Sequence, residues 1–447
     1  MPNPISSVLV VDTSASMTYS GYVAVTVIDS KAFVNCARAG DSIGVVNYDV
    51  NGNIAYPFTL VDAGLTVDQN AAQVIQNLSF QGSCTNIGGG IQAARAMLDT
   101  APNVRGMVLL TDGYQNCGTN PLTVLPTGYP IFACAMGPNS DQSLLQQIAS
   151  GTTGGKYYYA PYVVQMMQIY NQIRALNPLT QIIANNLNNI TPQNYELIPA
   201  TVSQGNSQAQ FVVTWTDTSF VYTGGIPTGN QLSITVVDPN GNVIQTAPTV
   251  ISSGFVVFDL PNPIVGQWQV QVEYPGASQP LPVTVGVFEF QSNAASPIAL
   301  EVTVPDTINA GDPLPCVAKV TDGDDLITGL NIHTEISQPK ISVSNAVKLY
   351  SDRLGTVQPA AVDVDGGMPD DLARLKALRI KHLPEIDILP TRVYAAPLRM
   401  GNDNHYRTVV NETAEAGSYN LHVRVTGYSS KSDTPFQRCQ LVSVLVK

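Results

Sequence analysis

Residues 8–17 read VLVVDTSASM, an apolar run that ends in a carboxylate and two hydroxyls. Such a run before a polar turn indicates a buried strand in a sheet that is covered on both faces. Asp12, Ser14 and Ser16 stand where this strand ends. Polar side chains are costly to bury without partners, so three of them together are not expected in an apolar core. They therefore build a turn or bind something.

Strand and helix patterns alternate through the first 175 residues. Further strand-like runs occupy residues 42–49, 54–61, 106–112 and 130–137. Helix-like stretches occupy residues 22–38, 68–78, 86–99, 141–150 and 161–175. Apolar strands that alternate with helices predict a parallel, doubly wound, Rossmann-like α/β sheet. We assign residues 1–178 to this domain.

Beyond residue 178 the pattern changes to short strand-like runs that are separated by Gly, Pro and Asn turns. Residues 191–291 predict an all-β sandwich with Trp268 in its core. Residues 296–447 predict a second, Ig-like β-sandwich, and the Leu-rich stretch 370–384 within it has helical periodicity. The fold class is therefore multidomain, with one α/β domain followed by two β-sandwiches, the last carrying a helical insertion.

Composition excludes several classes of partner. Only 12% of residues are charged, and no Lys or Arg lies between Arg174 and Lys319. Nucleic acids and anionic membrane surfaces both require a dense array of cations, so neither is an expected partner. The sequence has no apolar run of about 18 residues that could span a membrane. It begins without a signal-peptide pattern, although its richness in Asn, Gln, Ser and Thr favours a secreted or cell-surface protein, so the compartment stays open.

Two of the predicted strands end in aspartate, at Asp12 and Asp112. The carboxyl ends of parallel strands share one edge of the sheet, which is where open α/β folds bind ligands. Thr85 directly precedes the predicted helix 86–99 and reaches the same edge. The expected metal-binding set is Asp12, Ser14, Ser16, Thr85 and Asp112. Two carboxylates and three hydroxyls form an all-oxygen set that suits a hard cation.

Three short motifs carry a resemblance to a known family. DTSAS (12–16), SCTNIGGGI (83–91) and LLTDG (109–113) resemble the three loops of the metal-ion-dependent adhesion site of von Willebrand factor type A domains. The likeness covers roughly residues 5–176. It implies that the two serines and the threonine contact Mg²⁺ or Mn²⁺ directly or switch with state. The two aspartates would act largely through water.

The resemblance implies a metal-dependent protein-binding or adhesion module. With neutral hydroxyls as direct ligands the cation stays electrophilic, and an open sixth position favours a carboxylate from a partner. The expected partner is a protein that presents Asp or Glu. The alternative is a scaffold or assembly protein whose β-sandwiches bind and whose metal site is structural. A metal-dependent hydrolase ranks third, because no His lies near the three loops, and we expect no enzyme.

Each motif also has a purely structural interpretation. Ser14 and Ser16 could satisfy loop amides, Thr85 could cap its helix, and Asp112 could belong to a turn. The acidic loops 321–326 and 363–371 match no EF-hand spacing, so we expect solvated turns there.

Two further patterns concern cysteines and overall architecture. Cys84 and Cys117 border the site loops and form a candidate disulfide, with unrelated thiols as the equal alternative. Cys316 and Cys439 are a weaker candidate pair. A type A domain followed by PIVGQWQVQV (263–272) is similar to calcium-activated chloride channel regulators and their bacterial relatives, whose N-terminal zinc-protease domain has no counterpart here.

Overall fold

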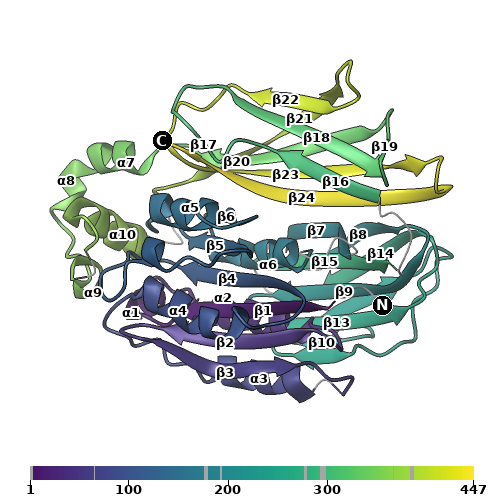
Figure 1. Ribbon diagram of the computed structural model, residues 1–447, viewed down its shortest axis with the longest axis horizontal. Helices are drawn as coiled ribbons and strands as arrows, with labels where there is room; N and C mark the ends of the chain where they lie inside the picture. The colour runs from purple at the N-terminus through teal and green to yellow at the C-terminus, as the bar shows by residue number, and fades with distance from the viewer. Residues whose placement is uncertain are drawn as a thin grey trace.

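The computed structural model divides into an α/β unit and two β-rich units that pack together (Figure 1). It describes residues 4–64, 66–175, 180–191, 194–275, 279–291, 298–365, 367–382 and 387–447. The predicted domain boundaries at residues 178 and 296 lie outside the described residues. Within these ranges no helix is long and apolar enough to cross a membrane.

The first unit is a six-stranded sheet with the order β3-β2-β1-β4-β5-β6. Its strands are β1 (Ile5–Asp12), β2 (Ser42–Tyr48), β3 (Gly52–Leu60), β4 (Val104–Thr111), β5 (Ile131–Met136) and β6 (Lys156–Ala160). Five strands run parallel, as predicted, whereas β3 pairs antiparallel with β2. The turn between β2 and β3 is too short for the crossover that a parallel pair requires.

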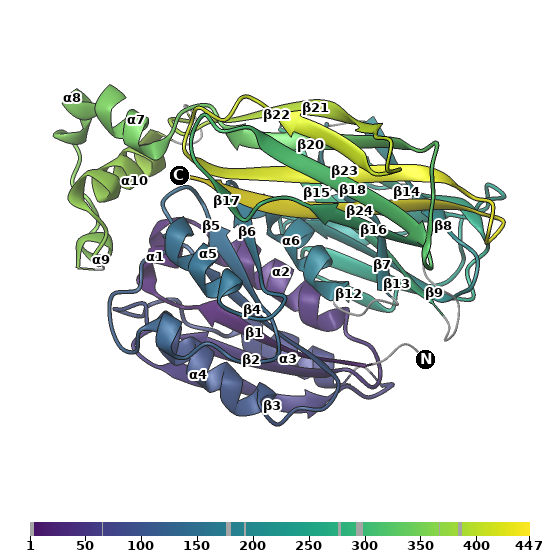
Figure 2. The same cartoon turned by 45° about the horizontal axis from the view of Figure 1, so that its top comes forward.

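Helices cover both faces of this sheet (Figure 2). Those of the first unit are α1 (Ala15–Tyr19), α2 (Val23–Asn35), α3 (Thr66–Gln76), α4 (Ile87–Leu98), α5 (Gln142–Ser150) and α6 (Met166–Arg174), with short 3₁₀ turns at Pro121–Thr123 and Val163–Gln165. Alternate residues of β1 divide between two cores. Leu9 and Val11 pack with α2, α3 and α6, whereas Val8 and Val10 pack with α4 and α5. This is the two-sided burial that a continuous apolar strand predicts.

The second unit consists of two facing sheets with the orders β10-β11-β14-β8 and β12-β13-β9-β15-β7. The strands are β7 (Thr180–Ile190), β8 (Asn194–Val202), β9 (Asn206–Trp215), β10 (Val221–Thr223), β11 (Gln231–Val237), β12 (Val250–Ser252), β13 (Phe255–Pro261), β14 (Gly266–Tyr274) and β15 (Leu281–Gln291). Trp268 is buried against Phe211, as expected of a core residue. The strand β7 precedes residue 191, where the predicted sandwich begins, and lies in the region beyond residue 178 where the sequence pattern changes.

The third unit is also β-rich, and its strands follow one continuous path, apart from the short strand Asp325–Leu326, which pairs with the strand Leu314–Asp322. They are β16 (Ile298–Thr303), β17 (Thr307–Ile308), β18 (Leu314–Asp322), β19 (Asp325–Leu326), β20 (Asn331–Pro339), β21 (Thr391–Met400), β22 (Tyr406–Val410), β23 (Gly417–Ser429) and β24 (Thr434–Val446). Most of β21 pairs with β20, but its last two residues pair with β22. This strand therefore joins two halves that share one apolar core.

A helical segment interrupts the third unit between β20 and β21. It contains α7 (Val343–Leu349), α8 (Ser351–Leu354), α9 (Ala361–Val364) and α10 (Asp370–His382). Leu354, Leu375 and Leu378 form part of a small apolar cluster of its own. The segment projects from the β-strands and lies beside α1 of the first unit (Figures 1 and 2). We call residues 340–390 the helical insertion.

The three units share buried contacts. One hydrophobic cluster contains Leu9 from β1, Phe288 from β15 and Leu441 from β24. Arg438 of β24 forms a buried ion pair with Glu289 of β15. The β-rich units therefore make buried contacts with the first unit and are not joined to it by the connecting chain alone.

Candidate metal site at the carboxyl edge of the first sheet

The site begins where β1 ends, at Asp12. One carboxylate oxygen of Asp12 accepts a bond from the Ser14 amide at 2.8 Å, and the other accepts one from the Thr111 hydroxyl. Ser14 occupies the N-cap of α1, yet its side chain makes no capping bond. Its hydroxyl instead lies 2.8 Å from the Ser16 hydroxyl. The structure therefore disfavours the interpretation that these serines only satisfy loop amides.

Asp112, which follows β4, connects the two strand ends. Its Oδ1 accepts a hydrogen bond from Ser16 Oγ at 2.7 Å, and its Oδ2 accepts one from Ser20 Oγ. A continuous polar chain therefore runs from Ser14 through Ser16 to Asp112. The sequence analysis had not identified either residue as part of the site: Ser20 lies outside the three motifs, and Thr111, although it is inside LLTDG, belongs to the apolar strand pattern.

Thr85 reaches the same edge from the loop before α4. Its amide donates to Asn116 Oδ1 at 2.6 Å, and its carbonyl accepts from the Asn116 amide at 3.2 Å. A disulfide joins Cys84 to Cys117 beside these bonds, which confirms the predicted pair. The loops that carry Thr85 and Asp112 are therefore fastened together. Helix α4 takes Asn86 as its N-cap, so the interpretation of Thr85 as the capping residue is wrong.

The hydroxyls of Ser16 and Thr85 border one small space beside Gly113. A Cβ placed on Gly113 would lie 3.5 Å from Ser16 Oγ and 3.5 Å from Thr85 Oγ1. The cavity there has a volume of about 10 Å³. That is room for roughly one water molecule or one small ion. The five predicted residues thus gather at one edge, and each is at most 4% exposed.

The helical insertion covers this edge. Lys376 of α10 places its ammonium 3.4 Å from Asp112 Oδ2 and 2.8 Å from Asp363 Oδ1, and Asp363 and Met368 line the small cavity. The expected open coordination position facing a partner is therefore closed by the chain itself in this structure. Asp363 is only 3% exposed, so the interpretation of residues 363–371 as a solvated turn is wrong at this position.

Burial dominates the electrostatics of these carboxylates. Burial, reinforced by the nearby Asp112 carboxylate, raises the pKa of Asp12 to about 7 against the hydrogen bonds from Ser14 and Thr111. Burial also raises the pKa of Asp363, although the Lys376 ammonium opposes that change. The neighbouring Asp112 and Asp363 raise the pKa of Lys376 despite its burial. The ammonium is therefore held in its charged form, whereas Asp12 has no comparable cation beside it.

The donor set fits a hard divalent cation. The small space is bordered by hydroxyl and carboxylate oxygens, the ligand type that Mg²⁺ and Mn²⁺ prefer. Among the described residues no group of three or more His, Cys, Asp or Glu side chains is arranged to hold a metal. A cation at this edge would therefore depend on the hydroxyls of Ser14, Ser16 and Thr85.

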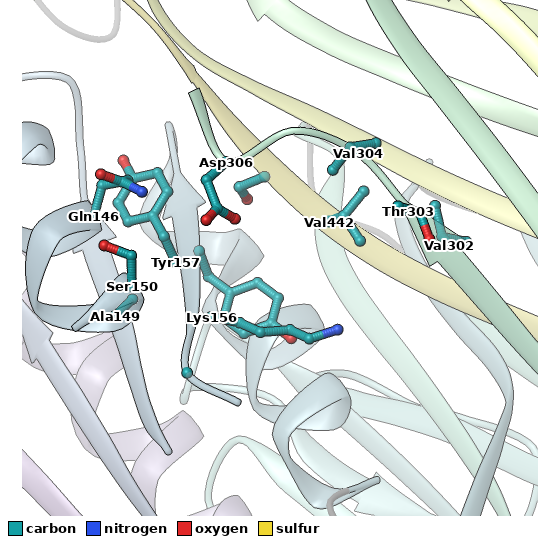
Figure 3. Close-up of a pocket in the computed structure, with 13 residues that line it drawn as sticks. Gln146, Ala149, Ser150, Lys156, Tyr157, Val302, Thr303, Val304, Asp306 and Val442 are labelled. Atoms are coloured by element: carbon teal, nitrogen blue, oxygen red, sulfur yellow. The ribbon is translucent and has the colours of Figure 1, made fainter. Parts of the chain in front are cut away.

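A larger cavity lies elsewhere, between the first and third units. Its volume is about 200 Å³, and Lys156, Tyr157, Asp306 and Val442 are among its lining residues (Figure 3). Lys156 is exposed to solvent, yet desolvation by the surrounding protein lowers its pKa against the opposing carboxylates of Glu301 and Asp306. The lining includes none of the five predicted site residues, so this cavity is separate from the strand ends.

The remaining cysteine prediction is wrong. Cys316 and Cys439 are both buried free thiols, and Cys439 lies against the Ile182 carbonyl of the second unit instead. Residues 316 and 439 both occur in β-strands, and such patterns contain no information on which thiols face one another.

Comparisons with known proteins agree with the fold of the first unit. Residues 8–172 match the family model of the von Willebrand factor type A domain. No curated protein matches the sequence.

Several solved structures are similar at low identity. A von Willebrand factor type A protein from Catenulispora acidiphila is 13% identical, with a TM-score of 0.37 over 72% of this chain and 64% of that one. Proximal thread matrix protein 1 from the mussel byssus, solved with a zinc-occupied adhesion-site motif, is 17% identical with a TM-score of 0.33. The match covers 42% of this chain and half the length of the mussel protein.

The domain of a type V pilus tip protein from Porphyromonas gingivalis is 18% identical, with a TM-score of 0.22 over 39% of this chain and 78% of that one. These scores are low, so the functional argument depends on the site itself. A relation to chloride channel regulators has no support among these matches. The sheet order, the three loops and the matching family model together establish that the N-terminal unit of this chain is a von Willebrand factor type A domain.

Proposed function

We propose that this chain is a non-enzymatic, metal-dependent protein-binding module of the adhesion type. Asp12, Ser14, Ser16, Thr85 and Asp112 would bind one divalent cation, Mg²⁺ or Mn²⁺, and the cation would take up an Asp or Glu carboxylate of a protein partner. The observation that carries the proposal is the polar chain from Ser14 through Ser16 to Asp112, with Thr85 facing the same space.

Calorimetric titration with MgCl₂ and MnCl₂ tests the metal site. Asp12→Ala and Asp112→Ala should each abolish stoichiometric binding while the circular dichroism spectrum stays unchanged. Asp62→Ala is the matched control, because Asp62 is an exposed carboxylate of the same domain. Unaltered metal affinity in both site variants would contradict the proposal.

The second candidate is a scaffold whose β-rich units bind the partner and whose metal site is structural. The covering of the site by the helical insertion favours this alternative, because a partner cannot reach the cation in this arrangement. A pull-down from the native source in Mg²⁺ and again in EDTA separates the two. Release of the partner by EDTA supports capture through the cation, whereas retention supports the scaffold.

A further inference from the structure

The two carboxylate oxygens of Asp363 have different surroundings. Oδ1 accepts a hydrogen bond from the Lys376 ammonium at 2.8 Å. Oδ2 is buried and has no hydrogen-bond partner among the described residues. A buried carboxylate oxygen without a partner is costly, so such an atom requires an explanation.

The position of Asp363 supplies that explanation. The residue borders the small cavity that Ser16 and Thr85 also border, and Met368 of the same segment closes another side. Its helix α9 lies beside α1, which carries Ser16 (Figures 1 and 2). The side chain that carries the unpartnered oxygen thus borders the same cavity as the candidate metal-binding hydroxyls of Ser16 and Thr85.

The charges at this edge are also unbalanced. Asp12, Asp112 and Asp363 are buried carboxylates, and Lys376 is the buried ammonium that contacts two of them. With all four groups ionised, three negative charges and one positive charge leave a formal charge of −2. Buried charge of this kind is neutralised either by uptake of protons or by a counter-charge. One divalent cation would bring the sum to zero.

We propose that Asp363 Oδ2 is the acidic ligand of the cation in this state, so that the chain itself supplies the carboxylate that a partner would otherwise supply. This inference rests on the metal site proposed above. Lys376 is a positioning residue, because it holds Oδ1 and thereby turns Oδ2 toward the cavity. A partner's Asp or Glu then competes with Asp363, and the helical insertion must move away for capture.

Titration of the full chain with Mn²⁺ tests this assignment. Asp363→Asn should weaken Mn²⁺ affinity by at least about tenfold, since loss of even an outer-shell partner has that effect. It should also raise the number of manganese-bound waters by one, as measured by water proton relaxation. Asp365→Asn is the matched control, because Asp365 is an exposed carboxylate two residues away and should change neither value. Unchanged affinity and unchanged bound water in Asp363→Asn would overturn the assignment.

Acetate rescue separates a ligand from a structural contact. In Asp363→Gly, sodium acetate should restore Mn²⁺ affinity toward the wild-type value, whereas sodium chloride at equal ionic strength should not. Failure of rescue in the folded variant would also overturn the inference. Asp112→Ala distinguishes the two levels of the proposal. If Asp112→Ala still binds Mn²⁺ normally, the metal site itself is wrong. If only the Asp363 variants behave as wild type, the site stands and the ligand assignment fails.

Discussion

Two buried clusters of acidic and basic side chains can be compared directly. In the first, between the β-rich units, Glu289 faces Arg438, and both side chains are at most 1% exposed. Both Glu289 oxygens accept bonds from Ser203, and the Arg438 nitrogens donate to Ser203 Oγ, Ile298 O and Gln437 O. Every polar atom of this pair has a partner, and its formal charge is zero.

The second cluster, at the carboxyl edge of the first sheet, is incomplete. The Lys376 ammonium donates to both Asp112 and Asp363, whereas Asp363 Oδ2 has no hydrogen-bond partner among the described residues. Both clusters are equally buried, so burial does not distinguish them. The two clusters differ instead in whether their charges and hydrogen bonds are balanced. The complete hydrogen bonding of the balanced cluster suits a structural role, and the unbalanced cluster is the one at which we propose a cation.

The largest expected effect comes from breaking the balanced pair. Arg438→Met would leave the Glu289 carboxylate buried without its counter-charge, which should lower the free energy of unfolding by about 3–5 kcal/mol. Urea unfolding measures this value. Arg392→Met is the control, because the pair between Arg392 and Glu412 is about half exposed, and such pairs contribute roughly 0–1 kcal/mol. If the two variants lost the same free energy of unfolding, the complete pairing of the buried Glu289 and Arg438 would not explain their contribution to stability.

The disulfide at the incomplete cluster should have the next largest effect. The paired residues are 33 positions apart, and closing a loop of that length stabilises a fold by about 2–4 kcal/mol. Cys84→Ser combined with Cys117→Ser should lose that stability and also weaken metal affinity, because the two site loops are no longer fastened. Mass spectrometry of unreduced, alkylated peptides provides the direct check. An alkylating label on both Cys84 and Cys117 would show that the bond is absent.

Mg²⁺ should stabilise the protein through the incomplete cluster alone. A ligand at 100 times its dissociation constant raises the free energy of unfolding by about 2.7 kcal/mol. Thermal unfolding in Mg²⁺ and in EDTA should show this increment in the wild type and in Arg438→Met, but not in Asp112→Ala. The same increment in Asp112→Ala would place the cation elsewhere.

The smallest effect concerns His422, a buried base that has no carboxylate partner among its described contacts. Burial, together with the nearby Arg424, lowers the pKa of His422 to about 3. Because this value is below the unfolded pKa of about 6.5, the unfolded state binds the proton first and stability falls as the pH decreases below 6.5. Between pH 6.5 and 5.5 the wild type should lose about 1 kcal/mol more than His422→Gln. Parallel pH profiles of urea unfolding for the two proteins would contradict this expectation.

The sequence predicts most of the first unit because its signals are local. The run that ends at Asp12, the hydroxyls that follow it and the Thr85 loop each occupy a few adjacent residues, and parallel topology then brings strand ends together. The direction of β3 was missed, although the short connection between the predicted strands 42–49 and 54–61 already leaves no room for the crossover that a parallel pair requires.

The covering of the site could not be predicted from these local signals. Lys376 contacts Asp112 across 264 positions of the chain. In the sequence, Lys376 belongs to a basic helix and Asp363 to an acidic turn, and both patterns are typical of solvated surface. Lys376 and Asp363 pair within the helical insertion, and the packing of the insertion against the first unit adds the contact between Lys376 and Asp112. A buried charge that is paired across such a distance leaves no periodic pattern.

The shared hydrophobic cluster also has a consequence for biosynthesis. Leu9 and Leu441 belong to the same cluster, so the core that begins with β1 is not complete until β24 has been made. At about 5–20 residues per second, a ribosome needs roughly 20–90 s to cover that stretch. During this time the nascent first domain presents an unfinished apolar surface, which is the kind of surface that chaperones bind. We therefore expect the first domain to complete its packing only after the final strand described here has been translated.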